Sequence, residues 1–198
     1  MMIPMNVNLA TVRPATPADA VDVIDLISFA DENALLYLTG QSDLQHAKQI
    51  YRQDFARDDV YFSYLFTQVC FVDGNLAGCI LAFPGFLEST FMTQSTRPLD
   101  DVREAEDDEL YIDSLAIYPA FRGQKLSRHL IDAADFLAKK YQLNKLSLLV
   151  DDAKPHLERM YEGYGFETVG TLTLDGVKHK KMTRVINPML SGLRIEQP

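Results

Sequence analysis

The stretch from Glu109 to Leu130 constrains the fold more than any other part of the chain. Two rows of side chains alternate along its first part, with Tyr111, Asp113, Leu115 and Ile117 in one row and Ile112, Ser114 and Ala116 in the other. Such alternation predicts a β-strand, and Pro119 ends it because proline has no N–H to give to a ladder. Apolar residues recur at helical spacing from Leu126 onward. We therefore expect a strand, a tight turn and a helix in direct succession.

The turn between this strand and helix is basic and contains a glycine. Free N–H groups and the helix dipole make the start of a helix attractive to anions. Arg122, Lys125 and Arg128 add positive charge beside it. A diphosphate would suit such a site, while a solvated basic turn without a ligand is the alternative reading.

The residues of this turn carry a resemblance to a known family. The run Ile117–Ser127 resembles motif A of the Gcn5-related N-acetyltransferases, the GNAT superfamily, which usually reads V-x-P-x-[Y/F]-R-G-x-G-x-G/A. The proline, the aromatic residue, the arginine and the first glycine match. Lys125 replaces the second glycine and Ser127 replaces the last small residue.

A second match lies downstream. The run Met160–Phe166 resembles the end of motif B of the same family, A-x-x-L-Y-x-x-x-G-F, with Tyr161, Gly165 and Phe166 identical. Lys154 stands where the family often has an asparagine that contacts the cofactor. The order and separation of the two motifs, together with the hairpin before them, extend the resemblance over residues 9–185.

The resemblance implies an α/β (α+β) GNAT acyl-CoA N-acyltransferase fold. Its central sheet is mixed and mostly antiparallel, with about six or seven strands flanked by about four helices. We expect a single domain over residues 1–186 and a C-terminal tail over residues 187–198.

Composition limits the alternatives. The 198 residues are 47% hydrophobic, which supports one sizeable core, and a net charge of −9 argues against nucleic acid as a partner. Neither a membrane-spanning apolar run nor a secretory leader is recognisable, so a cytoplasmic location is expected. Cys70 and Cys79 are expected to be free and buried, and the four histidines have no metal-binding spacing.

Other elements follow from local signals. Thr16-Pro17 predicts a helix start, and a second helix is expected from Ser42 with Gln45 completing a capping box. Asp73-Gly74-Asn75 predicts a hairpin turn within residues 61–83, and Asp175-Gly176 predicts another. Residues 84–108 stay open as a substrate-covering loop, a small helix or an oligomer contact.

Acetyl-CoA is the cosubstrate that the resemblance implies. Its diphosphate would meet the turn backbone and basic side chains, and its amide-rich arm would pair with the strand edge near Leu115–Ile117. The candidate cofactor-binding residues are Leu115, Ala116, Ile117, Arg122, Gly123, Gln124, Lys125, Leu126, Ser127 and Lys154.

Three residues are candidates for proton transfer in such a reaction. The resemblance makes Glu109 the first candidate to take the proton of the amine, because it stands seven residues before Ala116, where some members of the family have such a glutamate. Asp113 is the second candidate, since alternation puts it on the same side as Glu109 and Tyr111. The alternative reading of Glu109 is a continuation of the acidic run before it. Tyr161 is the candidate acid for the departing thiolate, with packing on the sheet as its alternative.

The resemblance therefore leads us to expect direct transfer of the acetyl group from acetyl-CoA to a primary amine, with both substrates bound at once in a ternary complex. A GNAT-fold module that binds acyl-CoA or a protein without turnover is the second reading. The acceptor, a small molecule or a peptide, is not readable, although Phe29, Leu36 and Tyr37 are candidates to shape its pocket. Dimers are frequent in the resembled family, so a homodimer is one candidate assembly.

Overall fold

The computed structural model describes residues 10–30, 32–94, 102–174 and 176–186. A seven-stranded sheet of order β1-β2-β3-β4-β5-β7-β6 runs through them, and β4 and β5 are its parallel neighbours. The strands are β1 (Ala10–Pro14), β2 (Thr67–Val72), β3 (Asn75–Pro84), β4 (Glu109–Ile117), β5 (Lys145–Asp151), β6 (Glu167–Leu174) and β7 (Val177–Val185). The α-helices are α1 (Ala20–Ala30), α2 (Glu32–Thr39), α3 (Leu44–Phe55), α4 (Glu88–Gln94), α5 (Leu126–Lys140) and α6 (Pro155–Glu162). The mixed, mostly antiparallel sheet expected from the sequence is confirmed.

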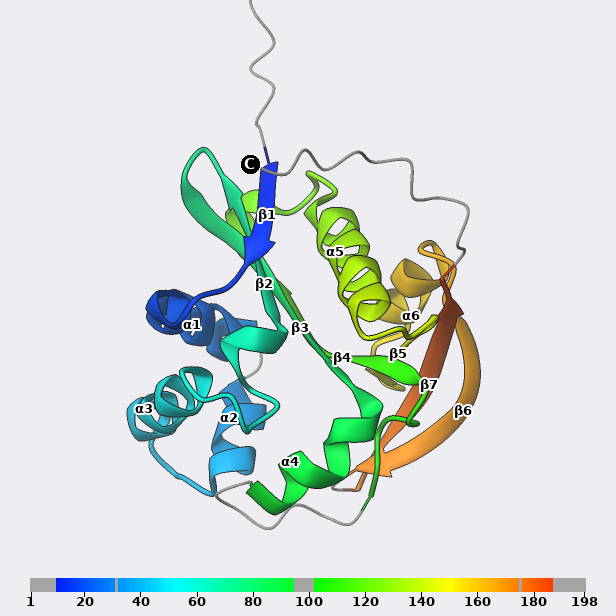
Figure 1. Ribbon diagram of the computed structural model, residues 1–198, viewed down its shortest axis with the longest axis horizontal. Coiled ribbons are helices and arrows are strands. Elements are labelled where there is room, and N and C mark those ends of the chain that lie inside the picture. The colour runs from blue at the N-terminus through cyan, green and yellow to red at the C-terminus, as the bar shows by residue number, and fades with distance from the viewer. Residues whose placement is uncertain (1–9, 31, 95–101, 175, 187–198) are drawn as a thin grey trace, which may run out of the picture.

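Helices cover both faces of the sheet (Figure 1). Side chains of α1, α2, α3 and α4 share one buried cluster with the sheet, and we call this side the α1–α3 face. Side chains of α5 and α6 share the other cluster, and we call that side the α5 face. The spacing of Leu126, Leu130 and Leu137 puts one apolar stripe of α5 on the sheet, as the sequence predicted.

The sequence missed one helix and misplaced the start of another. The second helix is expected from Ser42, but α2 precedes it as an extra helix. Asp43 then caps α3 by accepting the backbone N–H of His46 at 2.8 Å. At α6, Lys154 occupies the N-cap position without a side-chain hydrogen bond, and Pro155 is the first helical residue. These differences arise because several polar residues in a row can each satisfy a helix start.

A bulge interrupts β4 at Asp113. Leu81 of β3 pairs with Ser114 and Ala82 pairs with Ile112, so Asp113 has no partner on β3. The extra residue reverses the alternation beyond it. Leu115 and Ile117 therefore join Leu110 and Ile112 in the cluster of the α5 face, and the expectation of one unbroken alternating row is wrong.

The segment between β3 and β4 is partly helical. A short 3-10 helix, η3 (Gly85–Leu87), leads into α4, so the small-helix alternative is confirmed for this part. Residues 102–108 return to the sheet, where Ala105 is buried. Residues 95–101 and the predicted tail, 187–198, lie outside the described residues.

Both cysteines are free and buried, as expected. They pack in opposite clusters, Cys79 on the α1–α3 face and Cys70 on the α5 face, because they occupy adjacent rather than directly paired positions of the hairpin. In the part of the chain that the structure describes, no helix has the length and apolarity needed to cross a membrane. The same residues contain no group of three acidic, histidine or cysteine side chains that could hold a metal ion.

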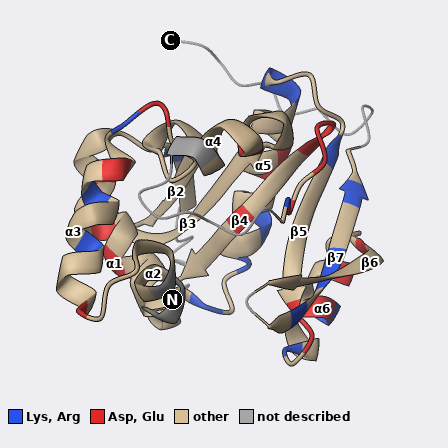
Figure 2. Ribbon diagram, turned by 90° about the horizontal axis from the view of Figure 1, so that it is seen from below, with Lys and Arg blue, Asp and Glu red and all other residues tan. Residues whose placement is uncertain are grey.

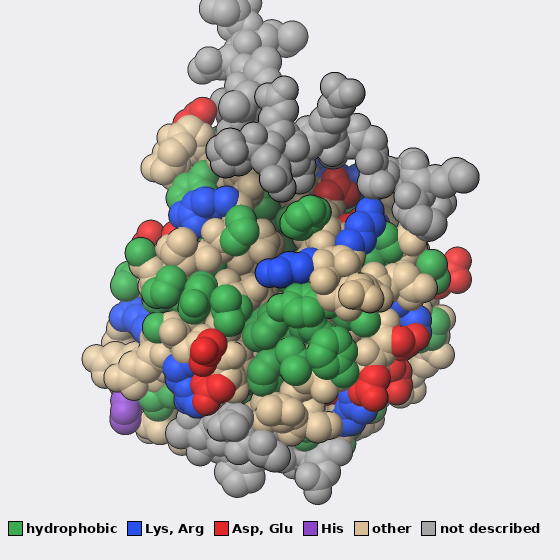
Figure 3. Space-filling model, in the orientation of Figure 1, with side chains coloured by type: hydrophobic (Ala, Val, Ile, Leu, Met, Phe, Trp, Pro, Cys, Tyr) green, Lys and Arg blue, Asp and Glu red, His purple; other side chains and the backbone are tan. Residues whose placement is uncertain are grey.

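Apolar side chains also reach the surface. They gather in the middle of the face seen in Figure 3, over the region between η2 (Tyr64–Phe66) and the end of α5. Beneath it, the buried ring of Phe66 in η2 packs against the half-buried ring of Tyr141 at the end of α5, with ring centroids 6.5 Å apart. This apolar patch is therefore continuous with the buried core beneath it.

Candidate active site

β4 and β5 pair over only part of their length. Their register runs from Glu109–Lys145 to Ile112–Leu148, and the strands have no pairing beyond it (Figure 2). From Asp113 to Ile117, the edge of β4 that faces β5 therefore has main-chain groups without a ladder partner. Leu115 and Ile117 are half-buried and Ala116 is buried at this edge. The sheet opens toward the end of β4, where the basic turn follows.

The turn and the start of α5 have the geometry that the predicted anion site requires. Gly123 has a φ of 79° and Lys125 a φ of 61°, so both adopt the left-handed conformation that favours glycine. No side chain caps α5, which leaves its first N–H groups facing outward. Arg122, Gly123, Gln124 and Lys125 are exposed, so this turn can approach a diphosphate.

Three residues of the turn have side chains that are already engaged. Leu126 is 3% exposed and packs in the cluster of the α5 face. The hydroxyl of Ser127 shares a hydrogen bond with the hydroxyl of Tyr164, and the Nε–H of Arg122 donates to the main-chain oxygen of Ile117 at 3.3 Å. The groups of this turn that could meet a diphosphate are thus main-chain N–H groups, the side chain of Lys125 and the remaining N–H groups of the Arg122 guanidinium. Lys154 lies at the start of α6, with its Nζ 3.7 Å from a carboxylate oxygen of Asp151.

Asp113 lies where the two strands begin to separate. The Ser114 hydroxyl donates to its Oδ2 at 2.8 Å, so the bulge turns both side chains toward each other. Burial raises the pKa of Asp113 to about 6, and the nearby Glu88 carboxylate adds to this, although the Ser114 hydroxyl lowers it. A carboxylate with a pKa near the operating pH can both take and release a proton.

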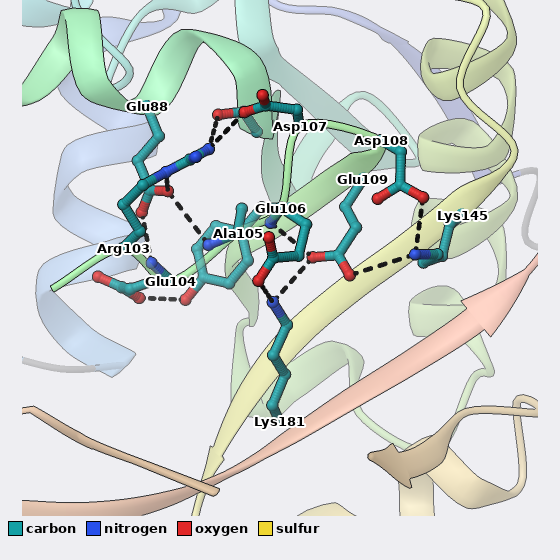
Figure 4. A network of polar contacts seen from close by, with 12 residues as sticks. Glu88, Arg103, Glu104, Ala105, Glu106, Asp107, Asp108, Glu109, Lys145 and Lys181 are labelled. Atoms are coloured by element: carbon teal, nitrogen blue, oxygen red, sulfur yellow. Dashed lines mark hydrogen bonds and ion pairs between the residues drawn. The ribbon is translucent and has the colours of Figure 1, made fainter. Parts of the chain in front are cut away.

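Glu109 lies on the same side of the sheet but in a different setting (Figure 4). Its side chain is 3% exposed, with Lys181 at 3.0 Å and Lys145 at 3.7 Å. It also accepts the backbone N–H of Glu106 at 3.0 Å. Burial alone would raise the pKa of Glu109, but the Glu106 N–H and Lys181 outweigh it and the net pKa is lowered. Glu109 is therefore an ionised, internally paired carboxylate.

Figure 4 also shows how the segment before β4 is anchored. The buried carboxylate of Glu88 accepts the backbone N–H groups of Glu104 at 2.7 Å and Ala105 at 3.1 Å. Arg103 contacts the same carboxylate at 3.4 Å and Asp107 at 2.7 Å. This network fixes the residues that lead into Glu109 and Tyr111.

Tyr161 lies on α6, on the α5 face. Its ring packs edge-on to Phe166 with centroids 5.7 Å apart, and the side chain contacts the apolar cluster of that face. Burial raises the pKa of Tyr161 to about 12, with Tyr164 adding to the effect, so the hydroxyl stays protonated at neutral pH. Among the described residues this hydroxyl makes no hydrogen bond, and it is available as a donor.

The sequence did not single out an aromatic and acidic cluster on the α1–α3 face. Tyr51 of α3 and Tyr61 line the same small pocket. Burial raises the pKa of both, and the Asp113 carboxylate adds to the effect. The hydroxyl of Tyr111 donates to the carboxylate of Glu104. Tyr51 was visible only as part of an apolar helix face, and nothing in the sequence marked Tyr61.

The predicted pocket residues have separate surroundings. Phe29 is 59% exposed and its ring lies 6.2 Å from that of Tyr118, while Leu36 is half-buried against the core. The side chain of Tyr37 is outside the described residues. Neither Phe29 nor Leu36 lines a small pocket on this face, which is formed by Leu38, Thr39, Ile50, Tyr51, Asp54, Val60, Tyr61, Phe62 and Phe91.

Comparisons with known proteins define the family. The sequence profile described as the Acetyltransferase (GNAT) family matches residues 26–166, more than half of the chain. A search of curated protein sequences finds no match. The chain belongs to the GNAT family and is an N-acetyltransferase.

Solved structures agree with this fold. An N-acetyltransferase from Staphylococcus aureus Mu50 superposes with a TM-score of 0.73 at 24% identity, covering 87% of this chain and 99% of that chain. A spermidine N-acetyltransferase variant from Vibrio cholerae gives a TM-score of 0.60 at 18% identity, covering 89% and 93%. A structure described as the NatC complex bound to Gag peptide and CoA gives 0.57 at 15% identity, covering 90% and 99%.

Proposed function

We propose that this N-acetyltransferase moves the acetyl group of acetyl-CoA directly to a primary amine held in the same complex. The observation that carries the proposal is the end of β4–β5 pairing at Ile112–Leu148, beside an uncapped helix with a basic turn. Both features lie toward the same end of β4. An extended, amide-rich thioester with a diphosphate at one end fits this combination of groups.

The cosubstrate is assigned to three groups of residues. The diphosphate meets the backbone of Gln124 to Ser127 and the side chains of Arg122 and Lys125, with Gly123 allowing the turn. The amides of the pantetheine arm pair with the free edge of β4 at Leu115, Ala116 and Ile117. Lys154 stands near the opening as a further positive charge, although it already contacts Asp151 at 3.7 Å.

Asp113 is the group that we assign to receive the proton of the amine. It is the first residue after the last β4–β5 pair and half-buried, and its pKa of about 6 makes it ionised at neutral pH. Glu109 lies four residues earlier, about 13 Å along an extended strand. Its lysine partners hold it ionised, so we assign Glu109 the role of fixing the closed end of the β4–β5 pair. The sequence favoured the reverse order of these two residues.

The reaction then requires one bond to form and one to break. The amine nitrogen, after losing a proton to Asp113, attacks the thioester carbon, and the carbon–sulfur bond breaks to release CoA thiolate. A main-chain N–H of the free β4 edge stabilises the oxygen while it carries negative charge. Tyr161 gives its proton to the sulfur and regains a proton from the new amide nitrogen, while Asp113 releases to solvent the proton that it took from the ammonium.

Among the similar structures, one is a spermidine N-acetyltransferase and another is a complex bound to a peptide and CoA. These neighbours support an amine acceptor in general.

Two measurements test the proposal. Acetyl-CoA should raise the melting temperature, since a ligand of the native state at 100 times its Kd adds about 2.7 kcal/mol. Thiol release with a panel of amines should follow. Binding without release from any amine would favour the module reading, in which the fold binds acyl-CoA without turnover. Absence of both binding and release would reject the assignment of this opening to acetyl-CoA.

A further inference from the structure

The start of α5 is held by side chains and not by a cap. Lys125, at the N-cap position, has a left-handed φ of 61° and makes no capping hydrogen bond. The N–H groups of an uncapped first turn have no partner within the helix, so contacts of its side chains decide how firmly it is held. Leu126 supplies an apolar contact in the cluster of the α5 face. Ser127 supplies a polar one, the hydrogen bond between its hydroxyl and that of Tyr164.

Tyr164 belongs to the turn between α6 and β6, which follows β5 in the chain. Its main-chain N–H donates to the oxygen of Tyr161 at 2.9 Å. Gly165 then has a left-handed φ of 87°, which glycine adopts without strain, and leads the chain toward β6. The Ser127–Tyr164 hydrogen bond therefore joins the helix that follows β4 to the turn after the helix that follows β5. It links the two sides of the sheet opening on the α5 face.

Two further side chains fix the position of Tyr164. Arg184 of β7 donates from Nη1 to the main-chain oxygen of Tyr164 at 3.3 Å, and the same guanidinium forms an ion pair with Asp135 of α5. The guanidinium carbon of Arg128 lies 5.7 Å from the centroid of the Tyr164 ring, a distance at which cation and ring attract each other. The start of α5 is thus connected to its own middle through the turn after α6 and through β7.

A first turn that is ordered before binding favours an anion. The main-chain N–H groups assigned to the diphosphate, from Gln124 to Ser127, can bind it together only when they point toward one place. If binding itself had to order this turn, the affinity would fall by about five-fold or more for each residue ordered, because fixing a backbone costs conformational entropy. A side-chain contact that orders the turn beforehand removes that loss.

We propose that Tyr164 is a positioning residue for the diphosphate of acetyl-CoA, because its hydrogen bond to the Ser127 hydroxyl holds the first turn of α5 in the orientation that binds phosphate. This inference rests on the proposed function and adds to it a residue from the far side of the opening. Tyr164 acts through Ser127 and does not contact the cosubstrate. Gly or Ala at position 127, which the family motif usually has, could not form this contact.

Calorimetric titration of acetyl-CoA on variants of the full chain tests the proposal. Tyr164→Phe keeps the ring and removes the hydroxyl, so the Kd for acetyl-CoA should rise about five-fold, and Ser127→Ala should have the same effect. The double variant should also lose about five-fold, and not the roughly 25-fold expected for independent effects, since both substitutions remove one contact. Ser127→Thr keeps a hydroxyl and should restore the Kd to within about two-fold of the native value.

Kinetics and hydrogen exchange separate positioning from a general structural effect. In Tyr164→Phe the KM for acetyl-CoA should rise while kcat at saturation changes by less than about two-fold. With S-acetylpantetheine, which lacks the diphosphate, kcat/KM should be the same in the native protein and the variant. Amide exchange should become faster in residues 124–128 of the variant. Tyr141→Phe is the matched control, a half-buried tyrosine at the other end of α5 whose hydroxyl makes no hydrogen bond among the described residues, and it should change none of these quantities.

Three results would overturn the proposal: an unchanged Kd in Tyr164→Phe, additive losses in the double variant, or an equal loss of kcat/KM with S-acetylpantetheine. If Tyr164→Phe does not fold, the comparison of Ser127→Ala with Ser127→Thr decides the same question. Failure of the proposed function gives a different result, because acetyl-CoA would then not bind the native protein or no amine would release CoA. If the inference alone is wrong, the native protein still binds acetyl-CoA and releases CoA with an amine.

Discussion

Replacing Asp113 by asparagine should make the protein more stable and nearly inactive. Asn keeps the shape of the side chain and removes the charge that burial disfavours. A folded-state pKa of about 6 in place of 3.8 corresponds to about 3 kcal/mol at neutral pH, since a tenfold change is worth 1.36 kcal/mol. This figure is an upper value, because the residue keeps partial exposure and the new amide must find its own partners. For a chain of this size it equals roughly 6–12 °C in Tm.

The effect should depend on pH in one direction. The pKa of Asp113 is raised on folding, so the folded state binds the proton more tightly than the unfolded state between pH 3.8 and about 6. The stability of the native sequence therefore falls as the pH rises through this window and is level above it. The advantage of Asp113→Asn should grow from pH 4 to pH 6 and then stay constant.

Urea unfolding at pH 4, 5, 6, 7 and 8 measures this difference, and CoA release with an amine measures activity. Activity should fall about 10²- to 10⁴-fold, the range for loss of a general base, and the low-pH limb of kcat/KM should disappear. Asp132→Asn, at an exposed aspartate of α5, is the control and should change neither quantity. A variant that is less stable than the native protein at pH 8, or that keeps normal turnover, would refute the reasoning about Asp113.

The remaining predictions concern three other residues. Glu109→Gln should lower the free energy of unfolding by about 1–3 kcal/mol above pH 5, because Lys181 and Lys145 lose their carboxylate partner. The difference should shrink as the pH falls through the lowered pKa of Glu109. Abolished turnover with an unchanged urea midpoint would instead assign the role of base to Glu109. Lys125→Gly should raise Tm by a few degrees, since relief of a left-handed φ is worth about 1 kcal/mol. Calorimetric titration of acetyl-CoA measures any lost phosphate contact separately from this gain in stability. A lower Tm would show that the backbone of Lys125 is not strained. Tyr161→Phe should lower kcat with little change in the Kd for acetyl-CoA, and unchanged kcat would leave Tyr161 a packing role.

The sequence predicted the central elements well because their signals are local. The strand from Glu109 to Ile117, the turn at Gly123 and the helix from Leu126 have the predicted bounds. The hairpin turn at Asp73-Gly74 also has its predicted place, since both residues have positive φ. Alternation of apolar residues, proline and glycine each determine the conformation of only a few neighbouring residues. A single sequence is therefore enough to predict the elements that depend on them.

The bulge and the acidic cluster could not be predicted in this way. Nothing near Asp113 in the sequence requires an extra residue, because the bulge is defined only by the register with β3. Likewise, Tyr51, Tyr61 and Tyr111 come from three separate segments that meet only in the folded chain. The ranking of Glu109 above Asp113 followed from the position that some family members give to a glutamate, and it took no account of Lys181, which reaches Glu109 from a distant strand. The bulge, the tyrosine cluster and the pairing of Glu109 all depend on contacts between residues far apart in the sequence.

The restricted pairing of β4 and β5 has a mechanical consequence. Strands β1 to β4 and strands β5 to β7 each form a continuous ladder, and four residue pairs join the two halves. The lysines around Glu109 reinforce that short seam, with Lys145 contributed by β5 and Lys181 by β7. Beyond this seam the two parts of the sheet are joined by the side chains of the α5 face and not by main-chain hydrogen bonds, so a molecule lying between the free edges of β4 and β5 would contact both parts.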